Sequence, residues 1–184
     1  MYKIIALIGE AGAGKDALMK SVLCELPGLH EIVSCTTRPM REGEKEGVNY
    51  FYMTPDAFAE KVLNGEMLEA TQFNGWFYGT ALQSLDESVL NIGVFNPAGI
   101  EALLESPLVD VTVYRICTSD KERLLRQLNR EGNPDVNEII RRFKADQEDF
   151  CDLDFLYTPV SNETLAEFDE AIATIVSQIQ TSGN

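Results

Sequence analysis

Short runs of apolar residues alternate along the chain with stretches in which apolar residues recur at helical spacing. The apolar runs predict strands over residues 3–8, 31–34, 92–95, 109–117 and 157–160. Helical spacing predicts helices over residues 17–25, 54–65, 81–90, 96–105, 120–130, 136–150 and 164–179. Strands that alternate with helices are typical of a parallel sheet. The predicted fold class is therefore α/β, a parallel sheet core flanked by helices.

A second pattern interrupts this alternation. Residues 48–52 are strand-like and rich in aromatic side chains, and residues 67–73 and 76–78 flank Asn74-Gly75, the two-residue signal of a tight hairpin. Thr54-Pro55 between them is a typical helix start. We therefore predict a small β-rich insertion over residues 35–80.

The turn that leaves the first strand reads Gly9-Glu10-Ala11-Gly12-Ala13-Gly14-Lys15-Asp16. It matches the phosphate-binding loop G-x-x-x-x-G-K-[ST] at every fixed position except the last, where Asp16 stands. This loop is typical of P-loop nucleotide-binding proteins. Glycines let the backbone N–H groups turn toward an anion, and the following helix adds the positive end of its dipole. The alternative is a glycine-rich turn that only joins a strand to a helix, but the length of the pattern and its lysine favour a nucleotide site.

Composition narrows the classes of function. The 184 residues, 45% of them hydrophobic, suffice for one domain with a buried core. A net charge of −15 argues against general binding to nucleic acids or to anionic membranes. The chain shows neither an apolar run of transmembrane length nor a signal-peptide pattern, so we expect a cytoplasmic protein.

Cysteine usage agrees with that compartment. Cys24, Cys35, Cys117 and Cys151 are scattered without a C-x-x-C pair, which predicts free thiols rather than disulfides or a metal site.

The motifs after the glycine-rich turn carry a family resemblance. Thr36-Thr37-Arg38, Arg41, Gly43-Glu44, residues 47–51, 65–69 and 75–80, the arginine-rich segment up to Arg142 and Ser161-Asn162 follow one another in order. In these motifs the chain resembles the guanylate kinase family, P-loop enzymes that phosphorylate GMP with ATP. The resemblance covers nearly the whole chain, and it implies a monophosphate-binding subdomain at 35–80, a lid at 129–143 and a core at 1–34, 81–128 and 144–184.

The resemblance also implies roles for single residues. It assigns the binding of GMP to Ser34, Arg38, Arg41, Tyr50, Glu69, Tyr78 and Thr80. Binding of ATP falls to Gly9, Glu10, Ala11, Gly12, Ala13, Gly14, Lys15, Asp16 and Asn162, and catalysis to Lys15, Arg130, Arg141 and Arg142. Guanidinium groups and phenols suit a phosphate monoester, and a carboxylate with hydroxyls complements guanine. Taken singly, Tyr50 and Tyr78 could be core aromatics, Glu69 a solvated strand residue and the last three arginines helix-surface residues.

The sequence departs from the family pattern in three places. Val94 and Asn96 stand where the family has an acidic D-x-D pair, Asp16 replaces the loop hydroxyl, and Glu131 occupies an arginine position of the lid, with Arg130 one residue earlier. The family uses Mg²⁺ with ATP, and we expect Asp16 to be its ligand in place of the missing acid. The alternative is that Asp16 only complements the dipole at the start of its helix.

The sequence thus predicts a kinase that converts GMP or dGMP with ATP to GDP or dGDP. Two alternatives stay open: a deoxynucleoside monophosphate kinase of altered or broader base specificity, and a non-catalytic interaction module of guanylate kinase-like fold. ATP and GMP or dGMP are the expected partners, with no nucleic acid and no membrane, while monomer and homo-oligomer both stay open.

Overall fold

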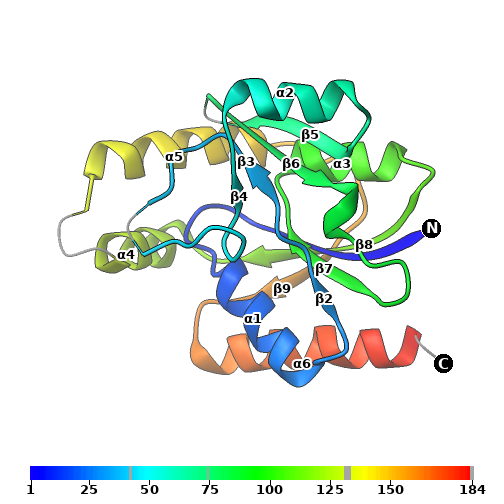
Figure 1. Ribbon diagram of the computed structural model, residues 1–184. Coiled ribbons are helices and arrows are strands. Elements are labelled where there is room, and N and C mark those ends of the chain that lie inside the picture. Colours follow the sequence, from blue (N-terminus) through cyan, green and yellow to red (C-terminus); the bar gives the residue numbers. More distant parts are fainter. Residues whose placement is uncertain (42, 74, 131–133, 183–184) are drawn as a thin grey trace. The chain divides into compact units, whose positions relative to one another are not determined.

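A computed structural model describes residues 1–41, 43–73, 75–130 and 134–182 of the protein (Figure 1). Its contacts divide the chain into two compact units. Unit 1 comprises residues 1–6 and 28–112, and unit 2 comprises residues 7–27 and 113–184. The strands β1 (Tyr2–Ile8) and β8 (Val109–Cys117) each run from one unit into the other.

The larger sheet has five strands in the order β2-β7-β1-β8-β9. Its outer strands are β2 (His30–Glu31), which pairs with β7 (Asn91–Val94), and β9 (Thr158–Ser161), which pairs with β8, and both pairs are parallel. In β1, five successive residues from Ile4 to Ile8 are buried, as expected for a strand covered on both faces. The predicted parallel α/β core is confirmed.

Unit 1 also contains a four-stranded sheet in the order β4-β3-β6-β5. Its strands are β3 (Cys35–Thr36), β4 (Phe51–Tyr52), β5 (Met67–Phe73) and β6 (Trp76–Ala81). Strands β5 and β6 form the predicted antiparallel hairpin, with Phe73 opposite Trp76, although Asn74 of the predicted turn lies outside the described residues. The predicted strand over 31–34 was placed incorrectly, because β2 ends at Glu31 and β3, in the other sheet, begins at Cys35.

Helix α2 (Pro55–Leu63) packs on this small sheet. Thr54 accepts a hydrogen bond from the Ala57 N–H at 3.2 Å and Pro55 fills the first helical position, as the sequence predicts. Phe58 of α2 lies beside Cys35 and Ala81 in a buried cluster and stacks on Phe77 at 5.6 Å between ring centroids. Helix α3 (Pro97–Glu105) contacts β5 and begins at Asn96, whose side chain accepts from the Gly99 N–H at 2.7 Å.

The helix predicted over residues 81–90 is wrong. Strand β6 continues to Ala81, a single 3-10 turn η1 follows at Leu82–Ser84, and the chain is irregular up to β7. The side chain of Asn91 accepts from the Asp86 N–H at 2.8 Å and donates to the Asp86 carbonyl at 2.8 Å, while Asp86 accepts from the N–H and hydroxyl of Ser88. Short polar side chains of this kind form hydrogen bonds with nearby backbone groups, and these hydrogen bonds compete with those of a helix.

Unit 2 carries the remaining helices. These are α1 (Lys15–Glu25), α4 (Asp120–Arg130), α5 (Val136–Asp149) and α6 (Leu165–Ser182). Helices α1 and α6 pack side by side, as Figure 1 shows, and α4 contacts α5. Buried Leu18 and Val22 of α1 and Ile175 of α6 contribute to the core of this unit.

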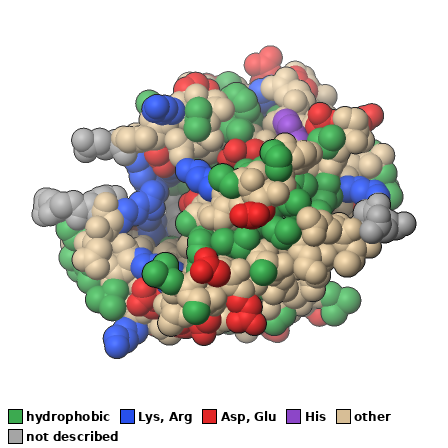
Figure 2. Space-filling view, turned by 90° about the horizontal axis from the view of Figure 1, so that it is seen from below, with side chains coloured by type: hydrophobic (Ala, Val, Ile, Leu, Met, Phe, Trp, Pro, Cys, Tyr) green, Lys and Arg blue, Asp and Glu red, His purple; other side chains and the backbone are tan. Residues whose placement is uncertain are grey.

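Three further observations concern the surface charge, membrane spans and the cysteines. Asp and Glu side chains are spread over the face of the molecule in Figure 2, in line with the net charge of −15. Within the described residues, no helix combines the length and apolar character that a membrane span requires. The four cysteines are free thiols, as predicted.

Candidate active site

The glycine-rich loop of unit 2 joins β1 to α1, and its own lysine closes it. The Lys15 ammonium donates to the carbonyls of Gly9 at 2.6 Å and Glu10 at 3.1 Å. Burial lowers the pKa of Lys15, while nearby Asp16, Asp146 and Glu10 act in the opposite direction. Lys15 therefore lies at the N-terminus of helix α1, as a cation that a phosphate oxygen could attract away from the carbonyls.

Gly14 is required where the loop becomes helix α1. It adopts a φ of +94°, and a Cβ at this position would lie 2.4 Å from the Nδ2 of Asn162. That amide in turn donates to the Ala13 carbonyl at 2.7 Å, and the Thr118 hydroxyl and Arg126 reach the same carbonyl at 3.2 and 3.3 Å. Three side chains thus hold the Ala13 carbonyl, and a glycine is needed to make room for one of them.

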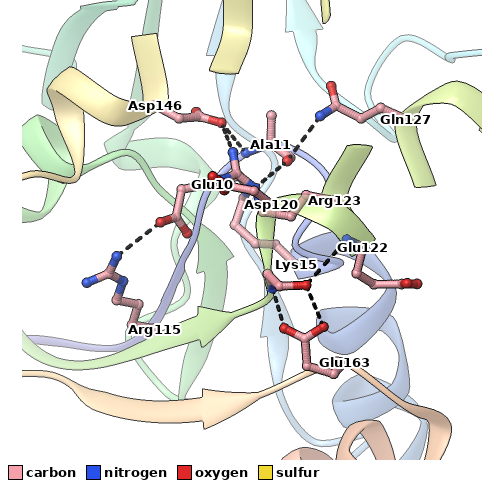
Figure 3. A network of polar contacts seen from close by, with 11 residues as sticks. Glu10, Ala11, Lys15, Arg115, Asp120, Glu122, Arg123, Gln127, Asp146 and Glu163 are labelled. Atoms are coloured by element: carbon pink, nitrogen blue, oxygen red, sulfur yellow. Dashed lines mark hydrogen bonds and ion pairs between the residues drawn. The ribbon is translucent and has the colours of Figure 1, made fainter. Parts of the chain in front are cut away.

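The middle of the loop has its own polar partners (Figure 3). Asp146 of α5 accepts from the Ala11 N–H at 2.9 Å, and Arg123 of α4 donates to the Ala11 carbonyl at 3.0 Å. Arg123 and Asp146 also form a short ion pair, in which both side chains are buried. Arg115 of β8 pairs with Glu10 at 3.0 Å, so side chains from three elements of unit 2 hold the loop.

The arginine-rich segment of unit 2 lies on α4 and α5. Arg130 and Arg142 line one small pocket, together with Gln127, Pro134, Asp135, Glu138 and Ile139. Glu138 accepts from Arg141 at 2.6 and 2.7 Å and from Arg142 at 2.9 Å. These hydrogen bonds, Arg141 first, lower the pKa of Glu138 to about 2. Glu138 is therefore a fixed anion that orients two of the three predicted catalytic arginines.

Unit 1 contains another arginine, Arg38, whose guanidinium pairs with a carboxylate. The Arg38 guanidinium is buried and forms a two-point ion pair with Glu44 at 2.9 and 3.0 Å. Glu44 also accepts from the Arg41 N–H and the Tyr52 hydroxyl, both at 2.7 Å. Burial would raise the pKa of Glu44, but hydrogen bonds from these partners outweigh it and lower the pKa to about 2.

Two tyrosines border the same guanidinium. The carbon at the centre of the Arg38 guanidinium lies 5.4 Å from the ring of Tyr50, and the rings of Tyr50 and Tyr78 are 6.0 Å apart in an edge-to-face arrangement. The sheet explains this grouping, because Thr36, two residues before Arg38, pairs with Tyr78 across β3 and β6. Arg38, Tyr50 and Tyr78 thus gather donors suited to a phosphate.

A row of polar residues crosses the small sheet next to this group. Glu69 of β5 lies opposite Thr80 of β6, and the pairing of Cys35 with Gly79, extended by one residue, places Ser34 opposite Thr80 on its other side. Glu69 is only 7% exposed, and burial raises its pKa to about 7. The Thr80 hydroxyl is buried as well, and its interaction with Glu69 acts against the effect of burial on the pKa of that carboxyl group. A buried carboxylate and a buried hydroxyl in one row can recognise a ligand with both donors and acceptors.

Comparison with known proteins identifies the family of this chain. A family model described as guanylate kinase matches residues 1–181. The chain belongs to the guanylate kinase family. It is 32% identical over 179 residues to a guanylate kinase of Thermotoga maritima, with 95% of this chain and 86% of the relative covered. It is 30% identical over 177 residues to a guanylate kinase of Nostoc sp., with 94% of this chain and 87% of the relative covered.

A solved structure supports the fold. The crystal structure of guanylate kinase from Anaplasma phagocytophilum matches with a TM-score of 0.76 at 22% sequence identity, over 98% of this chain and 86% of that chain. This likeness concerns the fold of the guanylate kinase family, the P-loop α/β architecture that the sequence predicts.

The residues predicted for a guanylate kinase site fall into two groups, one in each unit. Unit 1 holds Ser34, Arg38, Arg41, Tyr50, Glu69, Tyr78 and Thr80, and unit 2 holds residues 9–16, Arg130, Arg141, Arg142 and Asn162. The interpretation of Glu69 as a solvated strand residue is wrong, because its side chain is buried. Glu131 lies outside the described residues, and the assigned roles stay predictions.

Sequence reasoning missed the side chains that support these groups. Glu44 accepts from Arg38 and from the Tyr52 hydroxyl, while Arg123, Gln127 and Asp146 hold Ala11. A signal was available on α4, because Asp120, Arg123 and Gln127 recur at spacings of three and four and so share one helix face. Asp146 is 135 residues from Ala11 in sequence, and no local pattern connects them.

Proposed function

We propose that this protein transfers the γ-phosphoryl group of ATP to GMP or dGMP, giving ADP and GDP or dGDP. The observation that carries the proposal is Glu69, a buried carboxylate in a row with Thr80 and Ser34, in a chain of the guanylate kinase family. A carboxylate accepts hydrogen bonds from the N1–H and the exocyclic amine of guanine, and a hydroxyl donates to O6. Adenine presents the opposite pattern at these positions, so the row favours guanine.

The acceptor phosphate fits the second group of unit 1. In this proposal Arg38, Arg41, Tyr50 and Tyr78 hold the phosphate of GMP. The contacts of Arg38 with Glu44 and Tyr50 support it, because they keep a buried guanidinium in place before the substrate arrives. A pre-oriented fork loses little freedom on binding a phosphate.

The donor nucleotide belongs to unit 2. Backbone N–H groups of residues 9–16 and the Lys15 ammonium would bind the phosphates of ATP, and Asn162 would lie near its adenine. Arg130, Arg141 and Arg142 of the predicted lid would stabilise the charge that shifts as the phosphoryl group moves. Phosphoryl transfer needs no covalent intermediate and relies on positioning and electrostatic stabilisation.

Asp16 fits a magnesium ion bound with ATP. It is exposed in the first turn of α1, directly after Lys15, and so is accessible to an ion that also contacts phosphates. Mg²⁺ commonly takes one or two carboxylates together with phosphate oxygens and waters, so it needs no cage of protein ligands. The described residues contain no group of three or more His, Cys, Asp or Glu side chains arranged for a metal. When bound, the ion would neutralise charge on the phosphates.

A coupled assay of ADP release tests the proposal, with ATP as donor and a panel of ribo- and deoxyribonucleoside monophosphates as acceptors. GMP and dGMP are expected to give the highest kcat/KM. A better rate with AMP, CMP or TMP would assign the protein to a kinase of altered specificity. No transfer to any acceptor would favour a non-catalytic module, although the intact Gly9, Gly14 and Lys15 speak against that outcome.

A further inference from the structure

Residue Ala11 of the phosphate loop is held on both sides of its backbone. Its N–H donates to the Oδ2 of Asp146 at 2.9 Å. Its carbonyl accepts from the Nε of Arg123 at 3.0 Å and from the Nε2 of Gln127 at 3.2 Å (Figure 3). Two successive peptide groups are therefore fixed in orientation by side chains from α4 and α5.

Burying these three polar side chains costs more free energy than packing apolar side chains in the same place would. Arg123 and Asp146 are each 4% exposed and Gln127 is 8% exposed. Replacing a buried ion pair by apolar residues of similar volume is often neutral or stabilising. The Oε1 of Gln127 is moreover buried without a hydrogen-bond partner in the described residues. These costs point to a role beyond stability of the fold.

Peptide geometry indicates that role. In a planar trans peptide the carbonyl and the following N–H point in opposite directions. Because Arg123 and Gln127 draw the Ala11 carbonyl toward α4, the N–H of Gly12 points away from α4 and is directed by the same two side chains. Gly12 allows the close approach, since it has a φ of +83° and a Cβ there would lie 2.7 Å from the carbonyl oxygen of Arg123.

We propose that Arg123 and Gln127, with Asp146 holding Arg123 in place, are positioning residues that aim the Gly12 N–H at a phosphate oxygen of the donor nucleotide. The inference rests on the proposed function for the identity of that nucleotide. The guanidinium makes this arrangement possible because its fork donates to the Ala11 carbonyl and to Asp146 at once. Phe143 packs on its face, with 4.5 Å between the guanidinium and the ring centroid.

The first test replaces Gln127 by methionine. Gln127→Met keeps the volume and removes both the donor to Ala11 and the acceptor that has no partner, so the thermal midpoint should shift by less than about 3 °C. A less well oriented N–H should weaken binding of inorganic tripolyphosphate in calorimetry about 5- to 10-fold. In the kinase assay KM for ATP should rise by a similar factor, with kcat and KM for GMP unchanged within about twofold, as for a contact present before and during transfer.

A second pair of variants tests the ion pair. Asp146→Asn and Arg123→Lys should weaken tripolyphosphate binding more than Gln127→Met does, about 10-fold or more, because both loosen the Arg123 fork. Asp120→Asn is the matched control. It removes a carboxylate from the same guanidinium, at 2.7 Å, but that carboxylate is 69% exposed and does not contact the loop. Its tripolyphosphate affinity should stay within about twofold of that of the wild type.

The outcomes separate this inference from the proposed function. Wild-type tripolyphosphate affinity in both Gln127→Met and Asp146→Asn overturns the inference, as does an equal rise of KM for ATP and GMP together with a lowered thermal midpoint. A wild-type protein that phosphorylates no guanine nucleotide, while the variants still lose tripolyphosphate affinity, overturns the proposed function and leaves the positioning residues standing.

Discussion

Glu69 occupies strand β5 with its carboxyl group buried, and burial raises the pKa of this group to about 7. Guanine needs the ionised form, because only a carboxylate accepts from two N–H donors at once. Affinity for GMP should therefore fall as the pH drops below about 7, by up to about tenfold per pH unit. Calorimetric titration of GMP from pH 5 to 8 measures this, and a flat affinity over that range would contradict it.

The variant Glu69→Gln tests the same contact at constant pH. The amide presents a donor where guanine also has a donor, which leaves a buried polar group unpaired at a cost of about 1–3 kcal/mol. Preference for GMP over AMP, measured as the ratio of kcat/KM values, should fall about 10- to 100-fold. Since glutamine does not titrate, the variant should also lose the pH dependence of GMP binding.

Asp16 gives a second prediction at the residue scale. A carboxylate about 4 Å from a phosphate charge is repelled by about 4 kcal/mol at an effective dielectric near 20, unless a cation lies between them. Asp16→Ala should therefore raise the magnesium concentration needed for half-maximal rate several-fold. An unchanged magnesium curve with near-normal kcat would leave Asp16 as a residue that only complements the dipole of α1, worth about 0.3–1 kcal/mol.

At the scale of elements, helix α5 carries Arg142 on one turn with Glu138, to which it donates at 2.9 Å. A lid arginine acts on charge that develops during transfer, so Arg142→Ala should lower kcat about 100-fold while KM for GMP changes little. Lys144→Ala, an exposed change on the same helix, is the control and should stay near the wild-type rate. Unchanged kinetics in Arg142→Ala would remove this residue from the site.

The loop between β3 and β4 contains a buried ion pair of Arg38 with Glu44. The side chains of Arg38 and Glu44 are 7% and 12% exposed, and Glu44→Gln leaves the guanidinium without its carboxylate. Breaking a buried pair costs about 3 kcal/mol or more, which corresponds to a fall of the thermal midpoint by about 6–12 °C. Glu66→Gln breaks the more exposed pair with Lys61 and should shift the midpoint by less than about 3 °C.

The pH dependence of stability has a definite sign at this pair. The pKa of Glu44 is lowered to about 2 in the folded protein, from an ordinary value of 4.5. The pair therefore contributes its full stability above pH 4.5, and that contribution is lost as the pH falls from 4.5 toward 2. Acid unfolding followed by circular dichroism should show a smaller decline in this window for Glu44→Gln than for the wild type.

At the scale of the whole molecule, the residues predicted for GMP and those predicted for ATP belong to different units. Each nucleotide alone should therefore slow amide exchange mainly in one of them. GMP should protect residues 34–38 and 78–80, and tripolyphosphate residues 10–16. Hydrogen-exchange mass spectrometry checks this, and protection of residues 10–16 by GMP alone would contradict the division of the site.

The sequence predicted much of this architecture because the deciding signals are local. Gly9, Gly14 and Lys15 mark the loop, Thr54-Pro55 starts α2, and the dipeptide Asn74-Gly75 indicates the hairpin of β5 and β6. The false helix over 81–90 shows the limit, since the contacts of Asn91 with Asp86 decide that segment. The supporting partners Glu44, Arg123 and Asp146 depend on tertiary packing, and their charges alone could equally have indicated a solvated surface.

Four carbonyls of the glycine-rich loop accept hydrogen bonds from side chains: those of Gly9 and Glu10 from Lys15, that of Ala11 from Arg123 and Gln127, and that of Ala13 from Asn162. The conformational entropy of this segment is thus lost during folding rather than on binding. A nucleotide that binds as proposed would compete with the carbonyls of Gly9 and Glu10 for the Lys15 ammonium. In the proposed function the backbone N–H groups supply the donors to the phosphates, so replacing the side chains of Ala11 or Ala13 should change recognition little.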